Sequence, residues 1–153
     1  MSLRLTTQLS SPADPEALPL LDALSDELHA RFGSDGRARF AGWDEHDPRY
    51  IFVLARDGEG RPVGCGAVRP IGPGVGEVKR MFAAVPRQGV GSAVLERLVK
   101  EARTGGYGAL WLQTRWSNGT AVAFYRSHGF TVRENYGHYA GRTQCACFER
   151  RLF

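Results

Sequence analysis

The sequence has 153 residues, of which 42% are apolar and 24% charged, and it carries a formal net charge of +4. These values are ordinary for a soluble globular protein and predict one domain spanning residues 1–153. There is no long apolar run, no signal-peptide pattern and no basic run with interleaved aromatic residues, so we expect a cytoplasmic protein that enters no membrane and binds no nucleic acid.

The first part of the chain predicts a strand followed by a helix. Residues 3–9 alternate loosely between apolar and polar side chains, as a strand does. A helix then opens near Asp14-Pro15 or Pro19 and ends at Gly33. Residues 37–49 show no clear period and predict a loop or a short helix. The apolar stripe of the expected helix comprises Leu20, Leu21, Leu24, Leu28 and Phe32.

Two paired strands are expected next. Residues 50–56 and 62–69 are typical of a hairpin, with the turn Asp57-Gly58-Glu59-Gly60 between them. A second turn, rich in glycine and proline, covers residues 71–76. It leads into a strand that begins at Glu77.

The stretch from Glu77 to Thr104 combines a strand, a glycine-bearing turn and an amphipathic helix. The strand breaks at Pro86, and Gly89 and Gly91 lie in the turn. The first amides of a helix have no partner within it, and glycine lets a ligand approach the backbone closely. We therefore expect a phosphate-bearing ligand at this turn. The apolar face of the helix comprises Val94, Leu95, Leu98, Val99 and Ala102.

The last third of the chain predicts a strand, a helix and two further strands. The strand covers residues 109–114, and the helix covers residues 118–128. The final strands cover residues 130–133 and 145–152. Three cysteines (Cys65, Cys145 and Cys147) and four histidines (His29, His46, His128 and His138) show no metal-ligand or disulfide spacing, so we expect no metal.

Two motifs in this order resemble the GCN5-related N-acetyltransferase (GNAT) family. The family carries R/Q-x-x-G-x-G/A between its fourth strand and third helix, and Gly89-Val90-Gly91 occupies the glycine positions. In the family pattern the Arg or Gln stands three places before the first glycine. In this sequence that place is Pro86, and Arg87 comes one place later. The segment from Leu112 to Phe130 is similar to the family's fifth strand, the helix that begins with Asn, its Tyr and the closing Gly-Phe. A Walker A loop and a dinucleotide fingerprint are both excluded, since neither a Gly-Lys-Ser/Thr nor a third glycine follows.

The resemblance implies a mixed α/β fold with a central sheet of six to seven strands and about four flanking helices. It also implies acetyl-CoA as co-substrate, held by the glycine turn and by the strand end that precedes it. Ser92 is expected to cap the helix or bind phosphate, with capping favoured, and Asn118 to cap its helix, bind the pantetheine arm, or both. The implied acetyl-CoA contacts are Met81, Phe82, Ala83, Arg87, Gln88, Gly89, Val90, Gly91, Ser92, Asn118 and Tyr125.

Two residues are the predicted catalytic groups. Glu77 matches the family's general base, acting directly or through water, and the alternative is a solvated glutamate paired with Lys79 or an arginine. Tyr125 matches the general acid that protonates the departing CoA thiolate. The alternative for Tyr125 is a core aromatic side chain.

The acceptor is predicted to be a primary amine of a small molecule, attacked without a covalent enzyme intermediate. Two alternatives remain open: a macromolecular amine (a protein N-terminus, a lysine or an aminoacyl-tRNA), and a non-catalytic acyl-CoA-binding module. The oligomeric state is also open, with a homodimer as one option. Five side chains are candidates for the substrate mouth, with core packing or plain exposure as the alternative: Trp43, His46, Trp116, Tyr136 and His138.

Overall fold

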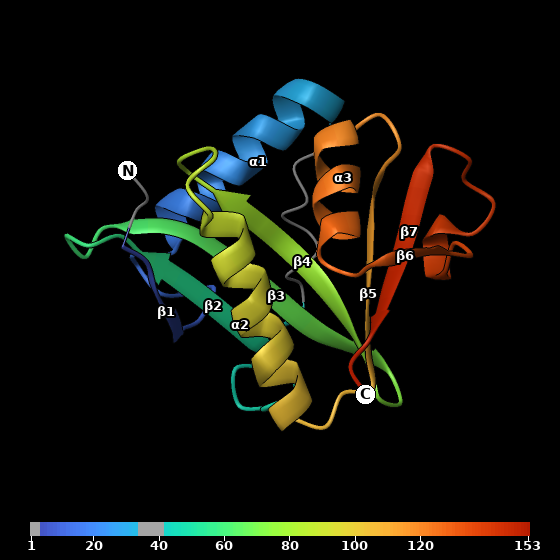
Figure 1. The fold of residues 1–153 in the computed structure, drawn as a ribbon, viewed down its shortest axis with the longest axis horizontal. Coiled ribbons are helices and arrows are strands. Elements are labelled where there is room, and N and C mark those ends of the chain that lie inside the picture. Colours follow the sequence, from blue (N-terminus) through green and yellow to red (C-terminus); the bar gives the residue numbers. More distant parts are fainter. Residues whose placement is uncertain (1–3, 34–41) are drawn as a thin grey trace.

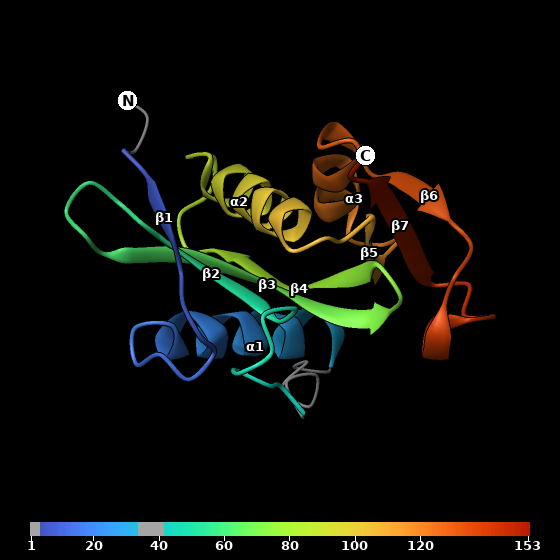
Figure 2. The same ribbon diagram turned by 90° about the horizontal axis from the view of Figure 1, so that it is seen from below.

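The computed structural model describes residues 4–33 and 42–153, which form a seven-stranded sheet with helices on both faces (Figures 1 and 2). The strand order is β1-β2-β3-β4-β5-β7-β6. Neighbouring strands are antiparallel except β4 and β5, which are parallel. The strands are β1 (Thr6–Leu9), β2 (Ile51–Arg56), β3 (Pro62–Gly72), β4 (Val75–Ala83), β5 (Ala109–Arg115), β6 (Thr131–Arg133) and β7 (Cys145–Arg151). The helices are α1 (Leu18–Phe32), α2 (Val90–Thr104), α3 (Gly119–Ser127) and the short 3₁₀ helix η2 (Gly137–Tyr139).

The helices divide the sheet into two unlike faces. Figure 2 shows α1 beneath the sheet and α2 and α3 above it. We call these the α1 face and the α2–α3 face. The apolar stripe predicted for α2 is fully buried against the sheet, and the upper core extends to Phe148 on β7. On the α1 face, Leu20 and Leu21 pack against Phe52 and Leu54 of β2.

The turn predicted over residues 71–76 is present but shorter, because most of that segment is strand. β3 continues to Gly72, β4 begins at Val75, and these two residues pair directly. Only Pro73 and Gly74 lie between them. Gly76 is a packing glycine rather than a turn glycine, since a Cβ there would lie 2.6 Å from a Val68 methyl carbon.

The helix count is also lower than expected. The described residues contain three α-helices and the 3₁₀ helix η2, against about four predicted helices. Residues 42–50 form successive turns, in which the carboxylate of Asp44 accepts the amide of His46 and that of Asp47 accepts the amide of Arg49, both at 2.9 Å. Such local bonds compete with helix formation. The rest of the predicted loop or short helix, residues 37–41, lies outside the described residues.

The parallel pair β4 and β5 is joined at three residue pairs only, a third of the nine residues of β4. Val75, Gly76 and Glu77 pair with Ala109, Leu110 and Trp111, and beyond these positions the strands diverge (Figure 1). A sheet that opens in this way leaves unpaired backbone edges facing one another. The opening between the two strands therefore offers room and hydrogen-bonding groups for a ligand.

Candidate active site

A cavity of about 360 Å³ occupies the opening between β4 and β5. Its walls come from the last two turns of α1, from both strands and from α3, so it is bordered by elements of both faces of the sheet. No helix in the described part of the chain is long and apolar enough to cross a membrane. Among the same residues no three His, Cys, Asp or Glu side chains gather as a metal site would require.

The cavity brings together five of the residues predicted from the sequence. Met81, Phe82 and Ala83 line it from β4, and Asn118 and Tyr125 line it from α3. The residues are about forty positions apart in the sequence, and the parallel crossover through α2 places them opposite one another. The remaining predicted contacts, residues 87–92, lie beyond the carboxyl end of β4 and outside the cavity wall.

The glycine turn leaves the start of α2 open. Arg87 and Gly89 both adopt left-handed backbone conformations, with φ of 58° and 78°. Gly89 is the N-cap residue, no side chain caps the helix, and the amide of Ala93 is bonded to the Gly89 carbonyl at 3.0 Å. The three amides before Ala93 therefore have no carbonyl within the helix to bind, and they carry the positive end of the helix dipole. Arg87 itself is exposed.

Gly91 is required by packing as well as by access. A Cβ at this position would lie 3.3 Å from the ring of Phe124, so the start of α2 approaches α3 closely. Glycine permits that approach because it has no Cβ. The turn is thus held beside α3, on the side of the sheet where Tyr125 lies.

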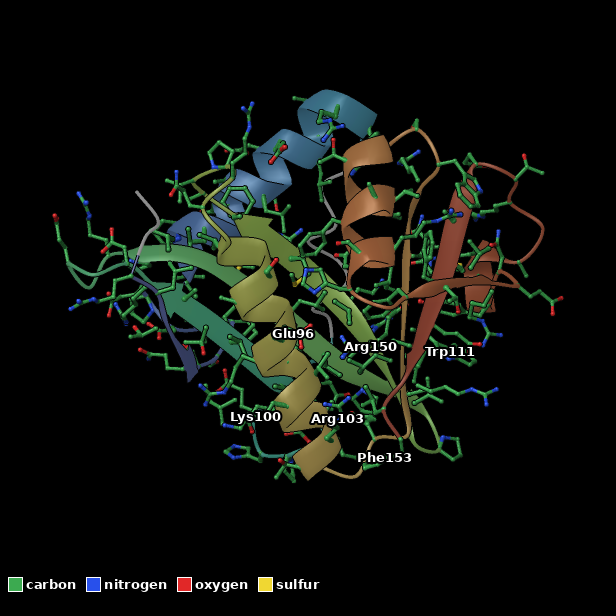
Figure 3. All side chains as sticks on the ribbon, in the orientation of Figure 1. Glu96, Lys100, Arg103, Trp111, Arg150 and Phe153 are labelled. Carbon is green, nitrogen blue, oxygen red and sulfur yellow. The ribbon has the colours of Figure 1, made fainter. Side chains whose placement is uncertain are left out.

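Ser92 does not cap α2, so that prediction is wrong. It lies three residues after the N-cap Gly89, and its Oγ is 2.9 Å from Nε2 of His128 at the end of α3. The other ring nitrogen of His128, Nδ1, lies 3.1 Å from a carboxylate oxygen of Glu96. Arg150 of β7 donates to that same oxygen at 3.2 Å and to the His128 carbonyl at 3.0 Å (Figure 3). This network, Ser92–His128–Glu96–Arg150, joins α2, α3 and β7.

Asn118 caps α3, as predicted. Its side-chain oxygen accepts the amide of Ala121 at 3.2 Å, and the residue also lines the cavity. Because a side-chain amide has one acceptor end and one donor end, the cap uses the oxygen of Asn118 and leaves its nitrogen pointing away from the Ala121 amide.

Tyr125 lines the cavity and has a packed ring. Its ring contacts Phe124 and Phe130, with centroids 5.1 Å and 5.7 Å apart. The hydroxyl makes no hydrogen bond to the described residues. Burial raises the pKa of Tyr125 above its ordinary value, so the hydroxyl is protonated at neutral pH and able to donate.

Glu77 is buried at the point where the pairing of β4 with β5 ends. Its residue is 1% exposed, which excludes the solvated alternative, whereas the predicted pairing with Lys79 and an arginine is confirmed. The Nε of Arg69 and the Nζ of Lys79 lie 3.0 Å and 3.2 Å from the same carboxylate oxygen, and Tyr136 donates its hydroxyl to the other. Burial acts to raise the pKa of Glu77, but Lys79, Tyr136 and Arg69 together outweigh it and hold the pKa below its usual value.

Glu77 does not itself line the cavity, although Lys79 does. Burial, together with the neighbouring Glu77 carboxylate, raises the pKa of Tyr136, so its hydroxyl stays protonated and keeps its bond to Glu77. The carboxylate is therefore ionised, and three donors surround it. Its role as a base remains a prediction.

The sequence interpretation missed the charged wall of the cavity on the α1 face. Arg31, Lys79, Gln113 and Arg115 all line it. For β5 a signal existed, because Leu110 and Leu112 are buried in the upper core and alternation places Gln113 and Arg115 on the opposite face. On β4, Val78 belongs to the same upper core, so alternation places Lys79 on the opposite face as well.

A bulge in β4 ends this alternation immediately after Lys79. Arg80 has a φ of 55°, and the register with β3 shifts at this point, so that Lys79 pairs with Ala67 whereas Phe82 pairs with Cys65. The extra residue breaks the alternation of the strand. Arg80 donates to the Leu21 carbonyl of α1 at 2.9 Å, and the adjacent Lys79 donates to the Tyr139 hydroxyl at 2.9 Å.

The five mouth candidates do not line the cavity. Trp43 packs edge-on against Tyr50 and Phe52, which is the core alternative. Trp116 is 44% exposed and contacts Phe148. Tyr136 still belongs to the surroundings of the site, because its hydroxyl donates a hydrogen bond to the Glu77 carboxylate.

Residues 17–130 match the model of the Acetyltransferase (GNAT) family. The match covers well over half of the chain, so the chain belongs to the GNAT family. The seven-stranded mixed sheet with its opening between β4 and β5 is the corresponding fold, as the sequence resemblance implied.

Two curated relatives illustrate the range of the family. The chain is 42% identical over 95 residues to the IAA acetyltransferase of Azospirillum brasilense, a match that covers 60% of this chain and 61% of the relative. It is 49% identical over 53 residues to the ribosomal protein bS18-alanine N-acetyltransferase of Escherichia coli strain K12, covering 33% of this chain and 36% of the relative. These matches span less than two thirds of either relative.

Solved structures match nearly the whole chain. A Klebsiella pneumoniae protein assigned to the acyl-CoA N-acyltransferases superposes with a TM-score of 0.79 and 26% identity, covering 97% of this chain and 98% of that one. The PaiA N-acetyltransferase of Thermoplasma acidophilum, solved in complex with coenzyme A, superposes with a TM-score of 0.73. At 15% identity over 97% of this chain and 99% of that one, the second match shows the fold alone.

Proposed function

We propose that this protein is an acetyl-CoA-dependent N-acetyltransferase that acts on a primary amine of a small molecule. The observation that carries the proposal is the cavity between β4 and β5, with Tyr125, whose hydroxyl is protonated, at its wall and an open helix start beyond the end of β4. Family membership supports the same reaction class. The amine attacks the acetyl carbonyl directly in this proposal, and the described cavity wall holds no cysteine or serine, Thr114 being its one aliphatic hydroxyl.

The residues present fit acetyl-CoA. The free amides of Val90, Gly91 and Ser92 suit a pyrophosphate, as the start of a helix attracts anions. Met81, Phe82 and Ala83 form the wall that the pantetheine arm would follow, with Asn118 on the opposite side. When bound, acetyl-CoA supplies the acetyl group as a thioester, whose thiolate is a fair leaving group.

Two kinds of group at the cavity wall act on the thioester: one protonates the departing sulfur and the other polarises the carbonyl. Tyr125 donates its proton to the departing sulfur, because burial keeps the hydroxyl protonated. Backbone amides at the unpaired edge of β4 near Phe82 and Ala83 polarise the carbonyl. Each step uses a group that is already in place and needs no rearrangement of the sheet.

Glu77 is proposed to accept the proton of the amine. An alkyl ammonium has a pKa near 10, so a base must assist at neutral pH. The lowered pKa of Glu77 makes the carboxylate a weak base, so proton transfer must accompany attack rather than precede it. Because neither Glu77 nor Tyr136 lines the cavity, whose β4 wall begins at Val78, the proton reaches Glu77 through a water molecule.

Isothermal titration calorimetry with acetyl-CoA tests the first requirement, and a thiol-release assay over amino acids, polyamines, aminoglycosides and peptides tests the second. We expect acetyl-CoA to bind and at least one small amine to release CoA. Absence of acetyl-CoA binding would end the proposal. Binding without release on any amine or peptide would instead support the non-catalytic acyl-CoA-binding alternative.

A macromolecular acceptor is the second candidate. The observation that favours it is the 49% identity over 53 residues to the bS18-alanine N-acetyltransferase. Release of CoA with peptides at more than tenfold higher kcat/KM than with every small amine would establish that candidate instead.

A further inference from the structure

Two guanidinium groups meet over one aromatic ring at the cavity wall on the α1 face. The central carbon of Arg115, at the end of β5, lies 4.8 Å from the centroid of the Phe32 ring, and that of Arg31 lies 5.0 Å from the same centroid. Phe32 is the last residue of α1, and all three residues line the cavity. Two like charges that converge on one ring repel each other, so an anion between them would be stabilised.

Carboxylates of the protein neutralise only part of this positive charge. Arg31 lies 3.7 Å from the carboxylate of Glu27, and both side chains are about half exposed. Arg115 is half-buried and forms no ion pair with any carboxylate of the described residues. The Phe32 ring compensates for its desolvation only weakly, because a cation–π contact is worth little beside a charge-assisted bidentate hydrogen bond.

The other cations at this wall are already engaged. Lys79 lies 3.2 Å from the Glu77 carboxylate and bonds to Tyr139, and Arg80 bonds to α1 through Ser25 and the Leu21 carbonyl. Arg115 is thus the guanidinium at this wall whose planar donor groups are available to a ligand. Guanidinium donors match the two oxygens of a carboxylate.

The position of Arg115 assigns this anion to the acceptor rather than to acetyl-CoA. Arg115 contacts α1, whereas the glycine turn and Tyr125 belong to the α2–α3 face. Along β5, Arg115 is four residues beyond Trp111, where the pairing with β4 ends, which corresponds to roughly 13 Å of strand. An acceptor with its amine toward Glu77 and its opposite end at Arg115 must bridge what remains of this length once both side chains reach inward, so acceptors of increasing length are compared below.

We propose that the acceptor is an amino acid-like molecule, a primary amine that also bears a carboxylate, and that Arg115, with Arg31 beside it, binds the carboxylate. This inference rests on the proposed acetyl transfer and adds the substrate class to it. Arg115 then determines specificity without touching the reacting atoms.

The first test compares acceptors that differ only in the anion. Thiol release is measured for glycine, β-alanine, 4-aminobutyrate and the α-amino acids, each against the amine of equal length without the carboxylate. We expect kcat/KM for the preferred amino acid to exceed that of its matched amine by about ten- to a hundredfold, the value of a charge-assisted hydrogen bond pair. Equal rates would overturn the proposal. A phosphate-bearing amine preferred tenfold over the carboxylate would overturn the carboxylate assignment.

The second test removes the guanidinium. Arg115→Met should raise KM for the amino acid about ten- to a hundredfold and leave KM for the matched amine and KM for acetyl-CoA unchanged. Arg115→Lys should recover part of the lost affinity for the amino acid. Arg151→Met is the control, because Arg151 is exposed on β7 and pairs with Ala109 at the opposite end of β5. Equal losses for both acceptor types would mean that Arg115 supports the fold instead, and would refute its role.

A third measurement separates this inference from the proposed function. Calorimetry of the preferred amino acid, or of 4-aminobutyrate if no turnover occurs, is carried out on the CoA-bound protein and on Arg115→Met. Carboxylate binding that the variant loses would support the anion site even without any acetyl transfer. Absence of binding to the wild type would refute the site, even if acetyl transfer to simple amines were observed.

Discussion

The two faces of the sheet are built from different kinds of interaction. On the α2–α3 face, a glycine turn, an uncapped helix start and an apolar helix stripe form one contiguous stretch of sequence. On the α1 face, charged and polar side chains from α1, β3, β4, β5 and the segment after β6 gather around the cavity and around Glu77. The face proposed to hold acetyl-CoA is therefore encoded locally, whereas the face proposed to bind the acceptor depends on contacts between distant elements.

The largest effect should come from blocking the proposed acetyl-CoA site at the start of α2. Gly91→Glu places a carboxylate and added bulk against the start of α2, where a Cβ would lie 3.3 Å from the Phe124 ring. We expect acetyl-CoA to lose its thermal stabilisation of the protein entirely, as measured by differential scanning fluorimetry. Gly72→Glu is the control, since a Cβ there meets nothing within 4 Å. Retained binding in the Gly91 variant would show that the turn is not the phosphate site.

The next largest effect concerns Glu77, whose buried carboxylate belongs to the α1 face. Glu77→Gln keeps the shape of the side chain and removes its charge, so turnover should fall by roughly a hundredfold to ten-thousandfold if Glu77 is the base. Acetyl-CoA affinity should change little, and the loss should shrink at high pH, where more amine is neutral. Equal kcat in mutant and wild type across the pH range would remove Glu77 from the mechanism.

The same variant tests the charge cluster by its pH dependence. The pKa of Glu77 is lower in the folded protein than its ordinary value of 4.5, so its contribution to stability is present above pH 4.5 and is lost as pH falls through the lower folded value. The free energy of unfolding of Glu77→Gln should therefore fall less steeply below pH 4.5 than that of the wild type. Glu149→Gln, which breaks the more exposed pair with Arg133, serves as the control in urea titrations.

A smaller effect is expected on the α3 side of the cavity. Tyr125→Phe removes one hydroxyl and keeps the ring contacts with Phe124 and Phe130, so unfolding should change by about 1 kcal/mol at most. Turnover should fall by more than that energy explains, about ten- to a hundredfold, yet less than for Glu77→Gln. Because burial raises the pKa of Tyr125, no loss of wild-type activity from this group is expected up to its ordinary value near pH 10. Unchanged kcat in the Phe variant would leave Tyr125 as a packing residue.

The smallest effect should come from the network that joins α2 to α3. His128→Ala breaks the links from Ser92 and Glu96, and should lower the free energy of unfolding by about 1 kcal/mol, with less than a tenfold change in acetyl-CoA affinity. His29→Ala, an exposed position on α1, is the control in chemical denaturation. If the two variants unfold identically, the network contributes nothing measurable.

Most of the fold was predictable because its signals are local. The stripe of α1, the stripe of α2 and the cap at Asn118 each follow from residues within one element. Errors arose where local signals were ambiguous. The predicted turn included Gly76, which instead packs within β4 against Val68, and Ser92 looked like a cap but bonds to His128 across two helices.

The sequence by itself determined the family, the glycine turn and the residues of α3 that face the cavity, because each depends on residue types at short, regular spacing. The tertiary structure alone decided the environment of Glu77 and the charge at the acceptor side. Three partners of Glu77 come from β3, β4 and the segment after β6, and the bulge at Arg80 breaks the strand alternation on which sequence reasoning relies. Arg115 and Phe32 lie more than eighty residues apart, and only the packing of α1 beneath the end of β5 brings them together.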